Sequence, residues 1–269
     1  MSIITISSNS EIIDTKISEQ IADRINYKKL DKSIITEIAS QYQLEQSKLN
    51  DVLETTPSLL KNISGKQWNY YLSCIESAVF DFMIKDNVIC WGLGAHLYVK
   101  DISHVMKVRV LINEDQYINE LAEQQKSTTL KIKKWLEGKN RQKKKWSMFA
   151  YNKDETDLDL YDFVVDLNKD NLDSAVQQIT KAVTQRKYEP VTYSIKSLLN
   201  KALAAKVRVE LSKSMNNIKV EVQDDVVIVS TKVNKRSKNE KISDIKELAG
   251  KIDGVKHVEV QIESSSSIF

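Results

Sequence analysis

The amino-acid sequence predicts an α/β protein in which helices flank a parallel sheet, followed by a small α+β domain. Two patterns indicate this architecture. In the longer first part of the chain, short apolar strands alternate with amphipathic helices, which is typical of a parallel sheet covered on both faces. Beyond about residue 194 the order becomes helix, hairpin, helix and strand. A length of 269 residues also suits two domains.

The strands of the predicted parallel sheet are short and apolar. Ile3 to Ser7 reads as a buried first strand, and the run Val88 to Trp91, ended by Gly92, is typical of a central strand. Ser10 precedes a helix whose isoleucines recur every four residues, at 13, 17, 21 and 25. Further strands are predicted at 27–30, 105–112 and 163–165, and further helices at 31–42, 45–54, 66–86, 114–126, 128–148 and 172–186.

The composition changes near residues 186–190, where a basic pair is followed by Pro190. The sequence therefore predicts two domains, at 1–188 and 194–269. In the second domain, Ile218 to Val222 alternates strictly between apolar and polar residues, as a half-buried strand does. The remaining elements are predicted as helices at 194–213 and 238–251, strands at 226–233 and 255–262, a turn at Asp224-Asp225 and a frayed tail at Ser264 to Ser267.

The overall charge does not identify a partner. Lys and Arg total 40 and Asp and Glu total 37, so the balance gives no reason to expect nucleic acid. Cys74 and Cys90 lie in apolar runs without metal-ligand spacing, which predicts buried, reduced thiols and neither a disulfide nor a zinc site. The start has no basic region, and no apolar run could form a transmembrane segment, so a cytoplasmic location is predicted.

Four segments of the first 185 or so residues occur together in an order and spacing known from one protein family. They are the strand 3–7 with the helix that contains residues 19–22, the stretch Tyr27 to Ile35, the turn Gly92 to Ala95 with residues 99–112, and Leu160 to Val165 with residues 172–176. Together they resemble the cytidylate kinase-like family. The resemblance implies a P-loop nucleoside monophosphate kinase-like fold, with ATP and Mg as the cofactors of an active member and CMP or dCMP as the phosphate acceptor.

The loop that would bind phosphate in this family lies between the first strand and the first helix. Phosphate binding there needs glycine, so that the backbone N–H groups can be approached closely. Residues 7–16 contain no glycine, and Glu11 and Asp14 would repel a polyphosphate. We interpret Ser10 as an ordinary helix cap, with the two acids placed favourably in the first turn. The degenerate loop positions are Ser8, Asn9, Ser10 and Lys16, of which Lys16 could supply one cation from a shifted position.

Two other parts of the kinase site also depart from the family pattern. In the turn Gly92, Leu93 and Gly94, the family usually has an arginine where Leu93 stands, and leucine offers the acceptor phosphate no charge and no donor. The lid region carries mostly lysines in place of arginines, which keeps the charge but loses bidentate geometry. Its candidate cations are Lys139, Arg141 and Lys143.

The last 75 residues carry a second resemblance. The segment Val222 to Ser230 resembles the hairpin of the BON domain, and Ile252 to Val258 resembles the Gly-Val and final strand of that domain. BON domains are regarded as modules that interact with ligands or membranes. The resemblance therefore implies a ligand for residues 194–269, whose identity the sequence does not give.

Three further groups of residues can each be interpreted as functional or as structural. The basic segment 131–146 could bind RNA, single-stranded DNA or acidic lipid, but we favour a solvated lid helix with Trp135 and Trp146 in the core. The three histidines, His96, His104 and His257, lack metal-ligand spacing and are interpreted as structural. In the acidic stretch from Asp154 to Asp159, Asp154 or Asp157 could face a nucleotide, although a solvated loop is favoured.

The sequence therefore favours a protein with no catalytic residues, no metal and no cofactor, which binds a ligand or partner through a kinase-like domain and a BON-like domain. An active cytidylate kinase that uses ATP and Mg is the alternative. A second alternative is an adaptor that binds nucleic acid or an anionic surface through residues 131–146, although nucleic acid is disfavoured. A nucleotide or a second copy of the chain is a further possible partner.

Overall fold

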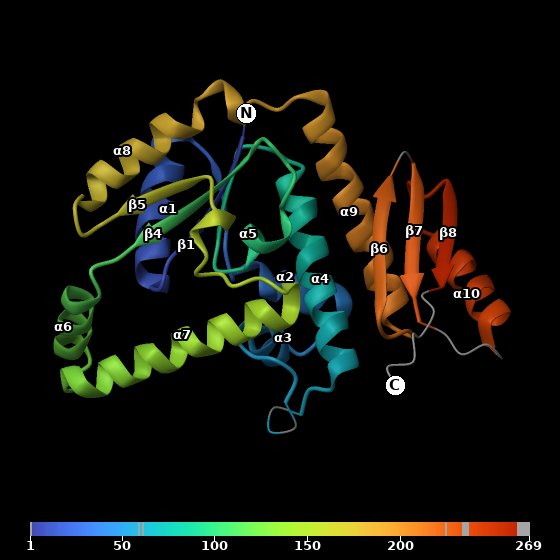
Figure 1. Cartoon of the computed structure of the whole chain (residues 1–269), viewed down its shortest axis with the longest axis horizontal. Coiled ribbons are helices and arrows are strands. Elements are labelled where there is room, and N and C mark those ends of the chain that lie inside the picture. Colours follow the sequence, from blue (N-terminus) through green and yellow to red (C-terminus); the bar gives the residue numbers. More distant parts are fainter. Residues whose placement is uncertain (1, 59, 61, 224, 233–236, 263–269) are drawn as a thin grey trace.

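A computed structural model describes residues 2–58, 60, 62–223, 225–232 and 237–262. Figure 1 shows a larger α/β part and a smaller sheet, with helix α9 running between them. The fold class predicted from the sequence is confirmed, because a five-stranded sheet is flanked by helices and a second, three-stranded sheet follows. Asp224 of the predicted turn, Val233 at the end of a predicted strand and the tail Ser264 to Ser267 lie outside the described residues.

The large sheet is parallel throughout and has the order β2-β3-β1-β4-β5. Its first strand, β1, therefore lies at the centre, with all five of its residues buried. Strands β1 and β3 run side by side, and both end where the chain turns toward a helix. The strand bounds are β1 Ile3–Ser7, β2 Lys28–Leu30, β3 Val88–Trp91, β4 Val105–Leu111 and β5 Phe163–Asp166.

The sheet separates two apolar cores. Because side chains alternate along a strand, Ile3 of β1 packs into one core while Ile4 and Ile6 pack into the other. Helices α2, α3, α4 and α5 contribute to the first core, and α1 and α8 contribute to the second. Their bounds are α1 Glu11–Ile25, α2 Ile34–Tyr42, α3 Gln46–Glu54, α4 Gly65–Met83, α5 Ala95–Tyr98 and α8 Leu172–Val183.

Helix α7 (Thr129–Tyr151) follows α6 (Glu114–Gln124) and crosses the large domain along one side, at the bottom of Figure 1. It is held near its C-terminal end by Trp146, whose indole N–H donates to the carbonyl oxygen of Val52 over 2.7 Å. The same ring lies against Gly94. The expectation that Trp135 also packs in the core was wrong: its side chain is 48% exposed, because it lies on the edge of the helix face that meets the protein.

The small domain has the element order predicted from its sequence. Helix α9 (Thr192–Ser212) precedes the antiparallel pair β6 (Ile218–Gln223) and β7 (Val226–Thr231). Helix α10 (Lys238–Gly250) then leads to β8 (His257–Ile262), which pairs parallel to β7. The sheet order β6-β7-β8 leaves β6 at one edge.

Helix α9 belongs to both parts of the molecule. Leu198, Ala202, Ala205 and Val209 on one side of the helix pack into the first large-domain core. Ala204, Val207 and Leu211 on another side pack into the core of the small sheet. The predicted domain boundary before residue 194 therefore precedes a helix that both cores use, and the division itself remains a prediction.

None of the helices in the described part of the chain has the length and apolarity needed to cross a membrane. The two cysteines are buried and free, as the sequence predicted. Burial raises the pKa of the Cys74 thiol to about 12, and it raises that of Cys90 further, so neither is a reactive thiolate at neutral pH.

The packing of Trp146 on Gly94 gives a testable pair of substitutions. Gly94 has a φ of +67°, and an added Cβ would lie 2.7 Å from the Trp146 ring, so Gly94→Ala should lower the free energy of unfolding by more than about 1 kcal/mol. Gly138 lies in the middle of α7 with nothing near its missing Cβ, so Gly138→Ala should raise stability by about 0.5–1 kcal/mol. Urea unfolding checks both, and equal effects of the two variants would contradict the packing described.

The double use of α9 predicts how a shortened chain behaves. A fragment of residues 1–188 lacks four side chains of the first core, two of them large, so it should be less stable than 1–215 by on the order of 5 kcal/mol. All four tryptophans, at 68, 91, 135 and 146, are present in both fragments, so tryptophan fluorescence during urea unfolding reports on the same domain. Equal midpoints would show that the large domain is complete without α9.

Candidate functional site

One cavity of the protein lies at the carboxyl ends of β1 and β3, the edge at which open α/β sheets usually bind ligands. Strand residues Thr5 to Ser7, the turn at Gly92 and Gly94, and the start of α1 form its base. Helix α7 closes it from above with Lys139, Lys143 and Trp146. The enclosed volume is about 80 Å³.

The loop between β1 and α1 is held by its own serines. The backbone N–H of Ser10 donates to the hydroxyl oxygen of Ser8 over 2.9 Å, and that hydroxyl donates back to the Ser10 carbonyl oxygen. The hydroxyl oxygen of Ser10 accepts from the backbone N–H of Ile13 over 3.2 Å, which makes Ser10 the cap of α1. The helix cap expected at Ser10 is therefore present, and both serines are buried.

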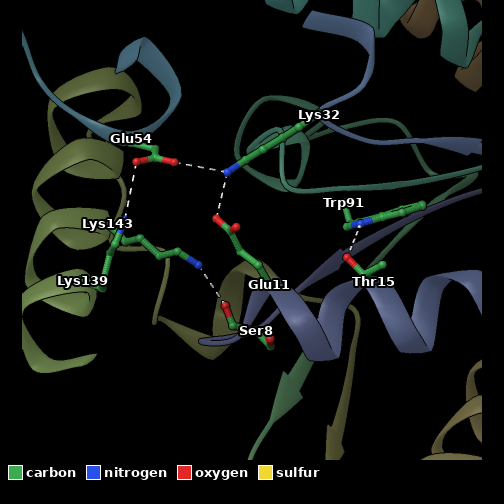
Figure 2. Close-up of polar contacts among 8 residues, drawn as sticks. All are labelled: Ser8, Glu11, Thr15, Lys32, Glu54, Trp91, Lys139 and Lys143. Carbon is green, nitrogen blue, oxygen red and sulfur yellow. Dashed lines mark hydrogen bonds and ion pairs between the residues drawn. The ribbon is translucent and has the colours of Figure 1, made fainter. Parts of the chain in front are cut away.

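A chain of ion pairs joins the start of α1 to α7 (Figure 2). The ammonium of Lys32 lies 2.8 Å from the carboxylate of Glu11 and 3.5 Å from that of Glu54. Glu54 is also 3.5 Å from the ammonium of Lys139 on α7. Burial alone would raise the pKa of Glu11, but Lys32, Lys143 and Lys139 together lower it, so this carboxylate is charged at neutral pH.

Lys143 bonds directly to the loop. Its ammonium donates to the carbonyl oxygen of Ser8 over 3.3 Å, as Figure 2 shows. Asp14 lies in the first turn of α1, as the sequence predicted, and it is 4% exposed and lines the same cavity. Burial raises the pKa of Asp14, and the charge of Lys143 only partly offsets the effect.

Arg109 of β4 is the second cation beneath the loop. It is 3% exposed, and its guanidinium donates to the Ser7 hydroxyl over 3.1 Å and to the side-chain oxygen of Asn9. It also lies over the Tyr161 ring, 5.8 Å from the ring centre. The side-chain oxygens of Ser7 and Asn9 therefore accept hydrogen bonds from a buried arginine.

Two further titratable side chains, His96 and Glu155, line the cavity. The sequence had not identified either of them as a binding residue. His96 stacks on Tyr161 and is buried, which together with the charge of Arg109 lowers the pKa of His96 to about 3 and keeps its ring neutral. Burial raises the pKa of Glu155, whose carboxyl lies among Lys143, Arg109 and Asp14. Its neighbour Asp154 forms an ion pair with Lys144 at 2.6 Å instead of facing the cavity.

The turn after β3 keeps the backbone geometry that its glycines allow. Gly92 and Gly94 have φ values of +73° and +67°, in the left-handed region that favours glycine. Leu93 between them is fully buried and belongs to the first core. The side chain of Leu93 is therefore directed to packing.

The remaining residues named from the sequence do not meet at this cavity. Lys16 is exposed on α1, and Arg141 is exposed on α7. The basic segment 131–146 divides between two faces, because Lys139 and Lys143 line the cavity while the other cations lie outside it. Near the two ends of α7, Leu130, Met148 and Phe149 are also exposed in part, although the Phe149 ring packs edge-on against Trp68.

Sequence reasoning missed the residues that reach the cavity from other segments. Arg109 stood inside an apolar strand, and Glu54 ended a helix with no known role. Among the residues that the structure describes, no group of three His, Cys, Asp or Glu side chains could hold a metal ion. His104 bonds to the Ser194 hydroxyl over 2.8 Å, and His257 is exposed.

Comparisons with known proteins agree with this architecture. Among solved structures, the chain is similar to an uncharacterized protein from Eubacterium ventriosum ATCC 27560, with a TM-score of 0.51 and 14% identity, over 69% of this chain and 100% of that one. A shikimate kinase from Bacteroides thetaiotaomicron gives a TM-score of 0.42 and 10% identity, over 68% and 99% of the two chains. The first likeness concerns the fold alone, and the second is too distant to support an argument.

No curated protein matched the chain. The model of one protein family, described as the cytidylate kinase-like family, matches residues 3–169. This match spans more than half of the 269 residues and includes the loop, the turn and α7. The chain therefore belongs to the cytidylate kinase-like family.

Proposed function

We propose that this family member has lost phosphoryl transfer and works as a non-catalytic protein that binds a ligand or partner. The observation that carries the proposal is that Ser8 and Ser10 bond to each other, that Ser10 caps α1, and that the Ser8 carbonyl accepts from Lys143. Loop donors that are bonded internally are not available to a phosphate. The active-kinase alternative requires these donors to be free.

The hydrogen bonds of the loop support this proposal most directly. Phosphoryl transfer is catalysed mainly by amides and cations positioned around the phosphates. In this loop the amides of Ser10 and Ile13 are both taken by serine hydroxyls. A polyphosphate would have to break these bonds and displace Lys143 from the Ser8 carbonyl. The residues present therefore do not fit the ATP–Mg cofactor of an active kinase.

The charges at the site favour the same conclusion. An active kinase presents an excess of cations to the transferring phosphoryl group. Here Lys32 and Lys139 pair with Glu11 and Glu54, and Lys143 lies near Asp14 and Glu155. Each inward-facing lysine thus has a nearby acid. A dianionic phosphate would meet a site whose charge is already balanced.

The size of the cavity is a third line of support. Pockets that bind small molecules usually enclose about 300–1,000 Å³. The cavity under α7 encloses about 80 Å³, and Trp146 and the Glu54 ion pairs close it. The acceptor side offers no replacement, because Leu93 is buried where the family's arginine would contact the monophosphate.

We further propose that residues 194–269 form a BON-like interaction domain and that the protein is cytoplasmic. The order of helix, hairpin, helix and strand supports the domain assignment. In this proposal the protein needs no cofactor and no metal, and its function resides in binding. The ligand of the small domain has not been identified.

The proposal makes a prediction about enzymatic activity. With ATP, magnesium and either CMP or dCMP, the full-length protein should show no turnover, because serine hydroxyls take the amides of Ser10 and Ile13, and Lys32 and Lys139 are paired with acids. Active kinases of this general class turn over about 1–100 times per second. A coupled ADP-release assay, with an active cytidylate kinase as a positive control, measures the difference.

A Lys143→Ala variant decides what any residual activity means. Turnover that persists unchanged in this variant arises from a contaminant and leaves the proposal standing. Turnover that the variant abolishes arises at this site, because the Lys143 ammonium contacts the loop directly. That second outcome would contradict the proposal and establish the active kinase.

A further prediction concerns the cap of α1. Ser10→Ala removes the hydroxyl that accepts from Ile13 N–H, and it should lower the free energy of unfolding by about 1 kcal/mol. The matched control is Asn171→Ala, which removes the cap of α8, does not touch the lining of the cavity and should cost a similar amount. Addition of millimolar ATP should not raise the melting temperature of the wild type or of either variant.

Protection by ATP is the informative contrary result. A ligand that binds only the folded state raises its stability by an amount that grows with the logarithm of the ligand concentration above its Kd. If ATP stabilised the wild type and the Asn171→Ala variant but not the Ser10→Ala variant, the loop would be a nucleotide site. The interpretation of Ser10 as a structural cap would then be wrong.

A further inference from the structure

A second, larger hollow lies outside the kinase-like site, between the two parts of the molecule. It is a groove of about 630 Å³, within the range of volumes that bind peptides and small molecules. Its floor is a stripe along α9 that includes Asn200, Lys201 and Arg208. One wall is formed by α4 and the residues around α5, and the opposite wall is β6.

The position of the groove follows from the two packing faces of α9. Leu198 and Ala202 turn toward the large core, while Val207 and Leu211 turn toward the small sheet. Residues 197, 200, 201 and 208 lie on the stripe between these faces, so neither core covers them. The groove is therefore the space that remains where one helix supports two separate cores.

Strand β6 presents its backbone edge to this groove. It pairs with β7 on one side and, among the described residues, with no strand on the other (Figure 1). Residues 219–223 all line the groove, although their side chains alternate between buried and exposed. Side chains that alternate in direction cannot all point into the groove. The part of these five residues that faces it is therefore the backbone edge of the strand. Unpaired N–H and C=O groups on such an edge can bind an additional strand.

The charges around the groove favour an acidic ligand. Its lining carries four basic residues, Lys196, Lys201, Arg208 and Lys219, against three acidic ones, Glu76, Asp101 and Glu221. Arg208 pairs with Glu76, and Lys219 pairs with Glu221 at 2.7 Å. Within the described part of the chain Lys201 forms no ion pair.

From these observations we propose that the groove binds an extended peptide segment of a partner protein, which adds as a strand to the free edge of β6 and places an acidic side chain near Lys201. Five residues of β6 span about 16 Å, which corresponds to a bound segment of five or six residues. The groove is separate from the cavity under α7, so this proposal does not depend on whether the kinase-like site is active.

The test uses a random hexapeptide library displayed on phage and selected against the full-length protein. The best-enriched hexapeptide is then synthesised, and its affinity is measured by fluorescence anisotropy. We expect an acidic residue in the selected sequences and binding that weakens at least tenfold in Asn200→Trp, which fills the floor of the groove, and in Lys201→Glu. Leu199→Trp is the matched control, because Leu199 is 47% exposed on the same helix and does not line the groove.

Strand addition has its own signature in the peptide backbone. Successive residues of a strand direct their N–H groups to opposite sides, so only alternate ones can bond to β6. N-methylation of the peptide should therefore abolish binding at every second residue and have little effect at the residues between.

Three results would overturn the proposal. The first is that no hexapeptide is enriched by the wild type over the Asn200→Trp protein. The second is that the selected peptide binds both proteins equally, or that N-methylation acts without alternation. The third is that ATP or phosphatidylserine vesicles bind in a manner sensitive to Asn200→Trp while peptides do not, which would assign the groove to a nucleotide or a lipid.

Discussion

The contact between Trp146 and Gly94 fixes the arrangement of the whole kinase-like site. Because residue 94 has no Cβ, the indole ring can lie against the turn after β3, and its N–H reaches the carbonyl of Val52. Helix α7 then passes over the ends of β1 and β3, where Lys139 pairs with Glu54. From the same helix, Lys143 donates to the Ser8 carbonyl. The closed cavity and the satisfied loop both follow from this one approach of helix to turn.

The site is organised so that its charges are neutralised from within. Arg109 is a buried cation and Lys143 a partly buried one, and burial of a cation is costly unless nearby groups compensate for it. The compensation comes from Ser7, Asn9 and the Ser8 carbonyl, with the buried acids Asp14 and Glu155 close by. The polar residues of this loop therefore stabilise the charges of both cations from within the protein.

Local patterns in the sequence predicted most of the fold, and long-range contacts explain what they left out. The run Val88 to Trp91 and the cap at Ser10 are determined by neighbouring residues, and both were predicted correctly. Arg109 could not be assigned a role, because an arginine within an apolar strand is interpretable only when the Asn9 side chain, 100 residues away, is known to meet it. The exposure of Trp135 depended similarly on which side of α7 faces the sheet.

The double role of α9 has a consequence for the order in which the protein is made. A chain leaves the ribosome from its N-terminus, and domains usually fold as units while synthesis continues. Here the first core lacks Leu198, Ala202, Ala205 and Val209 until most of the chain has been translated. The apolar face of α4 that these residues cover therefore stays open during that interval, and nascent chains at this stage are natural clients for a holding chaperone.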